Sequence, residues 1–357
     1  MDSKKIYNLA MIGFGGMAGH HCTQLLKKNV PVNIIGIYDI KEERMQAARE
    51  RGLDTYPSKE ALLSDERVDI VLVATYNTTH ADLAIEALKA GKHVLCEKPV
   101  TIESADLERI MKTAKECGKV FGVDQNRRFN KDYILVKRVL ESGAIGMPYV
   151  IESRVEGSRG MPEGWRCTKA LGGGMMLDWG VHLIDQIVMM YEESKITDVY
   201  CKMYSVNYPE VDDNFRLTMT LDNGVTAQIE VSTNNFITHP RWYILGKEGT
   251  LQIDDWACNG KVMKPLSVQN TWSAEIAPDR AGPSKTMAKR DPSTVEITEL
   301  SAPTDVEDNL DPVYRQFIHA IEGGELTIKP EQCLRVVKIM EAAFLSAQTG
   351  KSIETSI

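Results

Sequence analysis

The sequence predicts an α/β protein of two domains, in which a doubly wound domain with a parallel sheet precedes an α+β domain. The chain has 357 residues, and single hydrophobic cores tend to split beyond roughly 250–300 residues. Its first third alternates apolar runs with helical stretches, which is typical of parallel strands joined by helices. From about residue 195 onward, alternating polarity predicts antiparallel strands. We place the domains at residues 1–125 and 126–357.

Five apolar runs predict the strands of the first domain. Continuous aliphatic and β-branched runs of this length suit strands that are buried on both faces. Two helical stretches between them, at 80–91 and 103–118, end in Gly91 and Gly118, where a helix favours a residue with left-handed backbone geometry. The five runs lie at residues 8–15, 32–39, 68–75, 92–98 and 119–125.

The second domain begins with a predicted helix at 130–143, with Asn130 as its N-cap and Gly143 after its end. "DNG" at 222–224 and "GKEG" at 246–249 predict tight turns between strands. Residues 259–309 are polar and lack a clear period, so they form either a surface loop or an extended arm. Helices at 311–324 and 330–350 close the chain.

The composition disfavours several classes of protein. A net charge of -8 argues against partners that are nucleic acids or anionic membranes, since both attract basic surfaces. The seven cysteines include no Cys-x-x-Cys pair, which indicates free thiols rather than a disulfide framework or a zinc site. No apolar window reaches the ~18 residues of a membrane span, and the N-terminal apolar run lacks a signal-peptide cleavage site. We therefore expect a soluble, cytoplasmic protein.

The glycine loop at residues 13–21 follows the first predicted strand and begins the first helix. Its pattern Gly13-x-Gly15-x-x-Ala18 is a variant of the dinucleotide-binding fingerprint. Gly13 permits a tight turn, Gly15 lets the backbone approach a pyrophosphate, and Ala18 allows close packing of the helix on the strand. The N–H groups at the start of the helix attract the anion. The alternative is a tight glycine turn that binds no ligand.

Asp39 ends the second predicted strand, where an acidic residue binds the ribose hydroxyls of a dinucleotide. Its carboxylate repels a 2′-phosphate, so the sequence predicts NAD rather than NADP as the cofactor. Lys41 and Arg44 keep NADP open, because either could approach such a phosphate if Asp39 turned away.

Three further stretches match one family in the same order along the chain. They are "ATYNTTH" at 74–80, "CEKPV" at 96–100 and "GGGMMLDWGVHLID" at 172–185, accompanied by "WR" at 165–166 and "GKEGTL" at 246–251. Together with the glycine loop, they resemble the Gfo/Idh/MocA family of NAD(P)-dependent oxidoreductases over essentially the whole chain. The resemblance implies a Rossmann domain followed by a domain with a large open antiparallel sheet, which often serves as the interface of a homodimer or homotetramer. Ala18 and Tyr76 depart from the commonest family pattern.

The carboxyl ends of the parallel strands predict where the reaction takes place. Asn77, Lys98 and Gln125 lie at three such ends, so they are expected to converge on the nicotinamide end of the cofactor. In the second domain, Asp178 and His182 fall on one stripe of a helix, together with Asp185. The glycines before them let the backbone pass close to another surface, for which we expect the cofactor.

Oxidation of a secondary alcohol requires a proton acceptor as well as a hydride acceptor. An imidazole suits the first task, a neighbouring carboxylate orients it, and an ammonium stabilises the developing alkoxide. The resemblance implies the same roles: His182 as general acid or base, Asp178 as its partner or as a substrate ligand, and Lys98 as the group that positions the oxygen. The division of proton transfer between Lys98 and His182 stays open. One alternative is a buried histidine satisfied by Asp178 or Asp185.

The sequence predicts two sets of contact residues, one for the substrate and one for the cofactor. No metal is expected, because no distinctive ligand motif is present and hydride transfer needs none. His21 is expected to be structural. The substrate is expected to contact Lys98, Arg128, Arg159, Trp165, Arg166, Asp178, His182 and Asp185. The cofactor is expected to contact Gly13, Phe14, Gly15, Gly16, Met17, Asp39, Arg44, Thr75, Asn77, His80, Glu97, Lys98 and Gln125.

These observations predict a dehydrogenase that transfers a hydride between a secondary alcohol of a cyclic polyol, sugar or glycoside and NAD. The first alternative is a lyase or glycosidase that oxidises a sugar carbon transiently, eliminates a substituent and returns the hydride. The second alternative is a nucleotide-sensing protein without enzymatic activity. The sequence does not identify the particular polyol or sugar.

Overall fold

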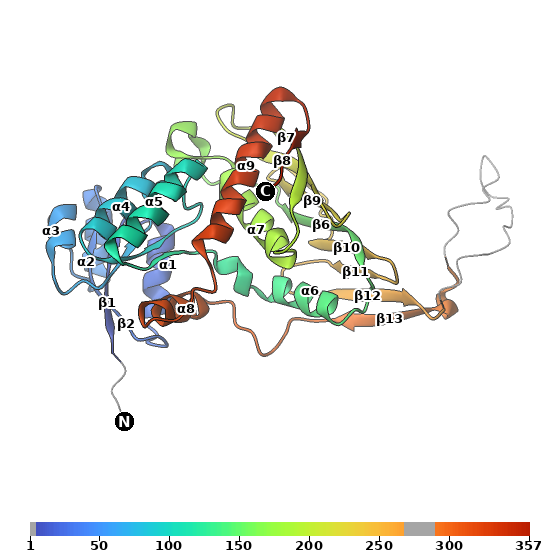
Figure 1. Ribbon diagram of the computed structural model, residues 1–357, viewed down its shortest axis with the longest axis horizontal. Coiled ribbons are helices and arrows are strands. Elements are labelled where there is room, and N and C mark those ends of the chain that lie inside the picture. Colours follow the sequence, from blue (N-terminus) through green and yellow to red (C-terminus); the bar gives the residue numbers. More distant parts are fainter. Residues whose placement is uncertain (1–4, 268–289) are drawn as a thin grey trace.

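The computed structural model describes residues 5–267 and 290–357, which form two sheets with helices packed against both (Figure 1). The smaller sheet comes from the N-terminal third of the chain, and the larger sheet comes from the rest. Part of the expected excursion at 259–309 lies outside the described residues. None of the described helices has the length and hydropathy needed to cross a bilayer.

The N-terminal sheet is entirely parallel and has the strand order β2-β1-β3-β4-β5. All five strands lie where the apolar runs predicted them, and each is shorter than its run. Their bounds are β1 (Tyr7–Ile12), β2 (Val32–Tyr38), β3 (Ile70–Val73), β4 (His93–Cys96) and β5 (Phe121–Val123). The helices of this region are α1 (Gly16–Leu25), α2 (Glu42–Glu50), α3 (Lys59–Ser64), α4 (His80–Lys89) and α5 (Ser104–Cys117).

Burial on both faces explains why these strands are apolar without interruption. Along β3, Ile70 and Leu72 pack into a core shared with α1, whereas Val71 and Val73 pack into a core shared with α4 and α5. Successive side chains point to opposite faces of a strand, so both sets must be apolar when helices cover both faces. The prediction of a doubly wound sheet is thereby confirmed.

The C-terminal sheet has nine strands in the order β13-β12-β11-β10-β6-β9-β8-β7-β14. All neighbours are antiparallel except β6 and β9, which run parallel. The predicted turns at 222–224 and 246–249 join β8 to β9 and β10 to β11. The bounds are β6 (Pro148–Glu156), β7 (Ile196–Tyr204), β8 (Asn214–Leu221), β9 (Thr226–Ser232), β10 (Trp242–Gly246), β11 (Thr250–Ile253), β12 (Gly260–Pro265), β13 (Val295–Leu300) and β14 (Ile353–Glu354).

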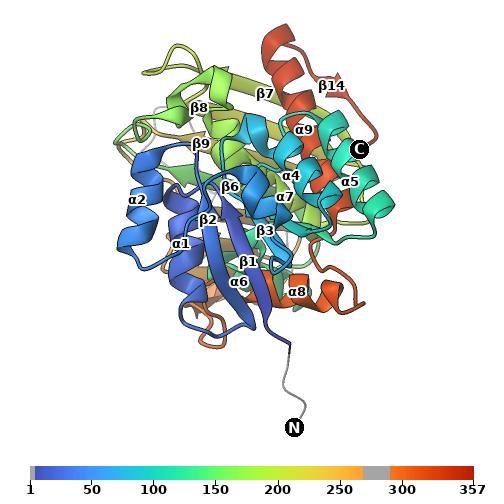
Figure 2. The same ribbon diagram turned by 90° about the vertical axis from the view of Figure 1, so that its left-hand side faces the viewer.

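One face of the large sheet is buried and the other is open. In β8, Phe215, Leu217 and Met219 are buried, whereas Arg216 between them is exposed. The buried face is covered by α7 (Val181–Met190) and α9 (Pro330–Thr349). Helix α9 also contacts α5 and β5, so it lies between the two sheets, as Figures 1 and 2 show.

Two predicted features of the second domain differ in detail from the structure. Asn130 does precede helix α6 (Lys131–Glu141), but its side-chain amide donates to Asp308 at 3.1 Å, and its side chain accepts no hydrogen bond from the N–H groups at the helix start. The described parts of the 259–309 segment contain β12 and β13, which pair and extend the sheet at one edge. Of the two expected alternatives, these parts therefore form the extended arm rather than the surface loop.

Helix α8 (Asp311–Ile321) follows the large sheet in the chain but packs against the N-terminal sheet. Its Phe317 ring lies so close to Gly122 of β5 that a Cβ atom there would approach it to 2.6 Å. Its Tyr314 hydroxyl lies 2.6 Å from Nδ1 of His21 on α1. The last part of the chain therefore completes the first core.

The buried His21 ring connects α1, α8 and the ends of two strands. Its Nε2 lies 2.8 Å from Glu97 Oε1, after β4, and 3.2 Å from Asp124 Oδ2, after β5. Burial alone lowers the pKa of His21, but hydrogen bonds to Asp124 and Glu97 outweigh it and raise the pKa to about 9. The histidine that the sequence indicated as structural is thus a charged bridge.

This bridge predicts a loss of stability at alkaline pH. Because the pKa of His21 is about 9 in the folded chain and 6.5 in the reference state, its contribution is complete below pH 6.5 and disappears as the pH rises through 9. The loss should be roughly 3 kcal/mol at most. We expect the free energy of unfolding, measured with urea, to fall less between pH 7 and pH 10 in His21→Gln than in the wild type.

The exposed His319 on α8 provides the control. His319→Gln should keep the alkaline loss of the wild type, because its side chain lies outside the buried cluster. Equal losses in all three proteins would contradict the charged bridge.

Candidate active site

The glycine loop after β1 forms the tight turn that its sequence predicted. Gly13 has φ of 94°, and a Cβ atom there would lie 2.4 Å from the carbonyl oxygen of Ala74. At Gly15 and Gly16, by contrast, a Cβ atom would meet nothing within 4 Å. The backbone of these two residues therefore faces open space at the start of α1, as the approach of a pyrophosphate requires.

Asp39 is held at the end of β2 by the loop itself. Its Oδ2 accepts a hydrogen bond from the Phe14 N–H at 2.7 Å, and its Oδ1 accepts one from the Lys41 N–H at 2.9 Å. These bonds fix the carboxylate beside the glycine loop, where it can accept hydrogen bonds from ribose hydroxyls. The turn, the open backbone and this carboxylate fit a dinucleotide.

A cleft of about 720 Å³ runs from the glycine loop to the second domain. Its volume lies within the usual range for small-molecule sites. It brings together residues predicted from both domains, namely Gly13, Gly15, Gly16, Met17, Asp39, Arg44, Thr75, Asn77, His80, Glu97, Lys98, Trp165, Arg166 and Asp178. Tyr76, where the sequence departs from the family pattern, also lines it and packs toward Trp165.

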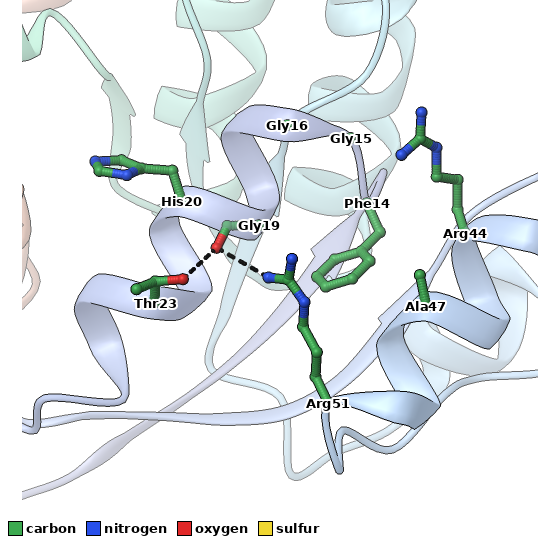
Figure 3. A pocket seen from close by; sticks show the side chains of 9 residues that line it. All are labelled: Phe14, Gly15, Gly16, Gly19, His20, Thr23, Arg44, Ala47 and Arg51. Atoms are coloured by element: carbon green, nitrogen blue, oxygen red, sulfur yellow. Dashed lines mark hydrogen bonds between the residues drawn. The ribbon is translucent and has the colours of Figure 1, made fainter.

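A second pocket of about 310 Å³ is lined by Phe14, Gly15, Gly16 and Arg51, among other residues (Figure 3). The Arg51 guanidinium packs over the Phe14 ring and donates to the carbonyl oxygen of Gly19. Arg44 lines both this pocket and the main cleft. A cation is therefore present close to the Asp39 end of the cleft.

Lys98 and Asp178 meet across the two domains. The Lys98 ammonium, just after β4, donates to the Asp178 carboxylate at 3.0 Å and to its backbone carbonyl at 2.8 Å. Arg166 donates to the other carboxylate oxygen at 2.9 Å. Burial alone raises the pKa of Asp178, but Lys98 and Arg166 lower it below its usual value, so the carboxylate is ionised.

His182 lies deeper, on α7, and is buried. Its pKa is held well below the usual value by burial and by the charges of Lys98, Arg127 and Arg241. The imidazole is therefore neutral at neutral pH. Among the described residues, no hydrogen-bond partner is present for its Nδ1, and no bond joins it to Asp178.

The expected stripe of Asp178, His182 and Asp185 is not formed as a unit. A π-helical turn, Met176–Gly180, precedes α7, so the spacing of a regular α-helix does not hold between Asp178 and His182. Asp178 binds two cations from other segments, and it does not orient the His182 ring. The sequence predicted Asp178 either as the partner of His182 or as a substrate ligand; its carboxylate binds Lys98 and Arg166 and makes no bond to His182.

The three glycines before this turn are required by close contacts within the protein. A Cβ atom at Gly172 would lie 2.8 Å from the Asn77 side chain, and one at Gly173 would lie 2.4 Å from the carbonyl oxygen of Arg166. One at Gly174 would lie 2.3 Å from an Asp212 carboxylate oxygen. Protein groups occupy the space that we had expected the cofactor to fill.

Asn77 and Asp212 hold this glycine segment from two sides. Asn77 donates from its amide to the carbonyl oxygen of Gly172 at 2.7 Å, which ties the segment to the first domain. The Asp212 carboxylate accepts from the Met176 N–H at 2.7 Å. Burial raises the pKa of Asp212 to about 7.

Six predicted site residues do not line the cleft, namely Phe14, Gln125, Arg128, Arg159, His182 and Asp185. Arg128 and Asp185 form a buried bidentate ion pair, with N–O distances of 2.8 and 2.6 Å, which links the 3₁₀ turn Asn126–Phe129 to α7. The two charges neutralise each other, so this ion pair is structural. Gln125 is buried, and Arg159 is exposed. His80 does reach the cleft, but its Nδ1 also donates to the carbonyl oxygen of Pro99 at 2.9 Å.

Sequence reasoning missed the residues that surround His182. Trp179 lies beside its ring, with ring centroids 6.0 Å apart, and the Arg127 guanidinium lies over Trp179. Arg127 follows β5 two residues after Gln125, so the strand-end argument could have found it. Arg241 and Trp256 come from distant parts of the large sheet, and the sequence carries no signal of their approach.

Known proteins share this arrangement of domains. Residues 7–125 match the family model described as an oxidoreductase family with an NAD-binding Rossmann fold, and residues 133–252 match the model of the GFO/IDH/MocA C-terminal domain. The structure of an NAD-binding protein from Listeria innocua is 41% identical, with a TM-score of 0.87, and the match covers 98% of this chain and 97% of that chain.

Two enzymes of known name are more distant relatives. An inositol 2-dehydrogenase of Salmonella typhimurium is 28% identical over 229 residues, which cover 63% of this chain and 66% of that protein. A scyllo-inositol 2-dehydrogenase (NADP(+)) of Bacillus subtilis is 26% identical over 312 residues, or 82% of this chain and 81% of that protein. With both of its domains matched in order, the chain belongs to the Gfo/Idh/MocA family of oxidoreductases, and its N-terminal domain is an NAD-binding Rossmann fold.

Proposed function

We propose that the protein is a dehydrogenase that oxidises a secondary alcohol of a cyclic polyol, sugar or glycoside reversibly. The observation that carries this proposal is the position of Lys98 and Asp178 in the wall of the cleft that begins at the glycine loop. The inositol dehydrogenases among the relatives support the same class of substrate. A bound nicotinamide would supply the hydride acceptor.

The residues of the chain bind and deprotonate the alcohol. Lys98 uses two of its three N–H groups on Asp178, so one remains for the substrate oxygen, where it stabilises negative charge. Asp178 keeps this ammonium in place, and Arg166 keeps Asp178 ionised. The imidazole of His182 is neutral and can accept a proton, whereas Lys98 can do so only as a neutral amine, so the division of proton transfer between them stays open.

Removing either group should abolish most of the turnover. With a panel of inositols, hexoses, amino sugars and glycosides, we expect NADH to accumulate at ~340 nm with the wild type, and Lys98→Ala and His182→Ala to lower kcat/KM by about 10²–10⁴-fold. Binding of NAD, measured by calorimetry, should change little in His182→Ala. Lys89→Ala, an exposed change on α4, is the control and should keep full activity.

The same assay separates the alternatives. Product formation without free NADH would indicate transient oxidation, as in the lyase or glycosidase hypothesis. Unchanged turnover in Lys98→Ala would remove the ammonium from the reaction and contradict the proposed mechanism.

The cofactor preference should depend on Asp39. Its carboxylate is fixed beside the glycine loop and repels a 2′-phosphate, while Arg44 lines the same cleft. We expect the wild type to prefer NAD and Asp39→Asn to shift the ratio of kcat/KM values toward NADP by about tenfold, which corresponds to roughly 1.4 kcal/mol. The double variant Asp39→Asn/Arg44→Ala should lose this gain. A wild type that prefers NADP would contradict the assignment.

We also propose that the open face of the large sheet forms a homodimer or homotetramer interface. Tyr200 and Tyr204 of β7 are exposed on this face, beside Arg216 of β8. Light scattering should give a mass of two or four chains, and Tyr200→Glu should lower it. Leu345→Glu, at an exposed position of α9 on the other side of the sheet, should not change the mass. A monomeric wild type would refute the interface.

A further inference from the structure

The groups around His182 carry more positive than negative charge. Lys98 and Arg166 share one carboxylate, that of Asp178. Arg241 pairs with Asp132 at 3.1 Å. In the described part of the chain, no ion pair or side-chain hydrogen bond is present for the fourth cation, Arg127. Arg127 is therefore the one of these four described cations that has no carboxylate partner.

Arg127 is positioned as a binding group. Its guanidinium lies over the rings of Trp179 and Trp256, at 4.2 and 5.3 Å from their centroids. The two ring centroids lie 5.8 Å apart, so the rings do not sandwich the guanidinium, and N–H groups at its edge remain for a ligand. Trp256 is 48% exposed, so the cluster is open to solvent on one side.

Burial disfavours the charged form of the Arg127 guanidinium. Burial lowers its pKa, and Asp132, Asp178 and Asp308 raise it only through longer-range attraction. Asp308 itself accepts hydrogen bonds from Asn130 and Lys131. A half-buried cation without a direct partner is favoured when a ligand brings the opposite charge, and a planar carboxylate matches the edge of a guanidinium with two parallel hydrogen bonds.

We propose that the substrate of this site carries a carboxylate, as a sugar acid or an acidic polyol does, and that Arg127 binds it. This inference rests on the proposed function, because it names the class of alcohol that the cleft oxidises. The carboxylate matches the single charge of Arg127, while Lys98 and Arg166, which both pair with Asp178, line the cleft where the alkoxide develops.

Binding of such a substrate would also raise the pKa of His182. Burial and the charges of Lys98, Arg127 and Arg241 lower its pKa. A carboxylate on Arg127 offsets one of these charges, so the imidazole binds a proton more readily once the acidic substrate is in place. A neutral polyol leaves His182 a weaker base.

Matched pairs of ligands test the proposal. Calorimetric titrations of the full chain, with and without NAD, would compare D-glucuronate with D-glucose and D-galacturonate with D-galactose, and D-glucose 6-phosphate would test a phosphate group. We expect at least one acid to bind about tenfold more tightly than its neutral partner and to change the tryptophan fluorescence, since Trp179 and Trp256 flank the guanidinium.

Variants then locate the effect. Arg127→Gln should remove the preference for the acid, Arg127→Lys should keep part of it, and Arg138→Gln on α6, where the side chain pairs with Asp305, should keep all of it. Equal or weaker binding of every acid would overturn the proposal, as would a stronger preference for the phosphate or an acid preference that survives Arg127→Gln.

The outcome separates this inference from the proposed function. If neutral sugars reduce NAD in a reaction that depends on Lys98 and acids have no advantage, the dehydrogenase stands and the carboxylate site falls. If acids bind through Arg127 and no alcohol of either kind is oxidised, the dehydrogenase falls.

Discussion

The site depends on the contact between Lys98 and Asp178, because this contact joins the domain of the parallel sheet to the domain of the large sheet. Lys98 follows a strand of the Rossmann domain, and Asp178 stands in the turn before the helix that covers the large sheet. Three glycines without side chains let the backbone before Asp178 press against its neighbours closely enough to make this contact. Bulk added there would separate the ammonium from its carboxylate.

Two carboxylates hold Lys98, one at its side chain and one at its backbone. Its ammonium is bound by Asp178, and its backbone N–H donates to the neighbouring Glu97 carboxylate at 3.1 Å. Glu97 in turn binds the His21 imidazole beneath the cleft. A chain of buried hydrogen bonds thus runs from Tyr314 of α8 through His21 of α1 and Glu97 to the backbone of Lys98, and such chains orient a group more rigidly than a single bond does.

The sequence predicted the fold well because the signals involved are local. Apolar runs and glycine turns report on a few adjacent residues, and both sheets followed from them. The site was predicted only in part. Lys98, Asp178 and the glycine loop do line one cleft, but a π-helical turn changes the helical spacing that paired Asp178 with His182. Arg128 and Asp185, which we expected to bind the substrate, form an ion pair with each other. The charge of Arg241 acts on His182 because of the register of the large sheet, which no local sequence pattern encodes.

The packing of α8 against the first sheet affects how the chain folds during its synthesis. The apolar side of α1 is completed by Val313, Tyr314 and Phe317, which the ribosome adds only after strands β6 to β13 of the large sheet. Until then, the nascent nucleotide domain has an uncovered hydrophobic surface, which is the kind of surface that chaperones bind. Protease digestion of ribosome-bound chains of increasing length should therefore find this domain sensitive until α8 has emerged.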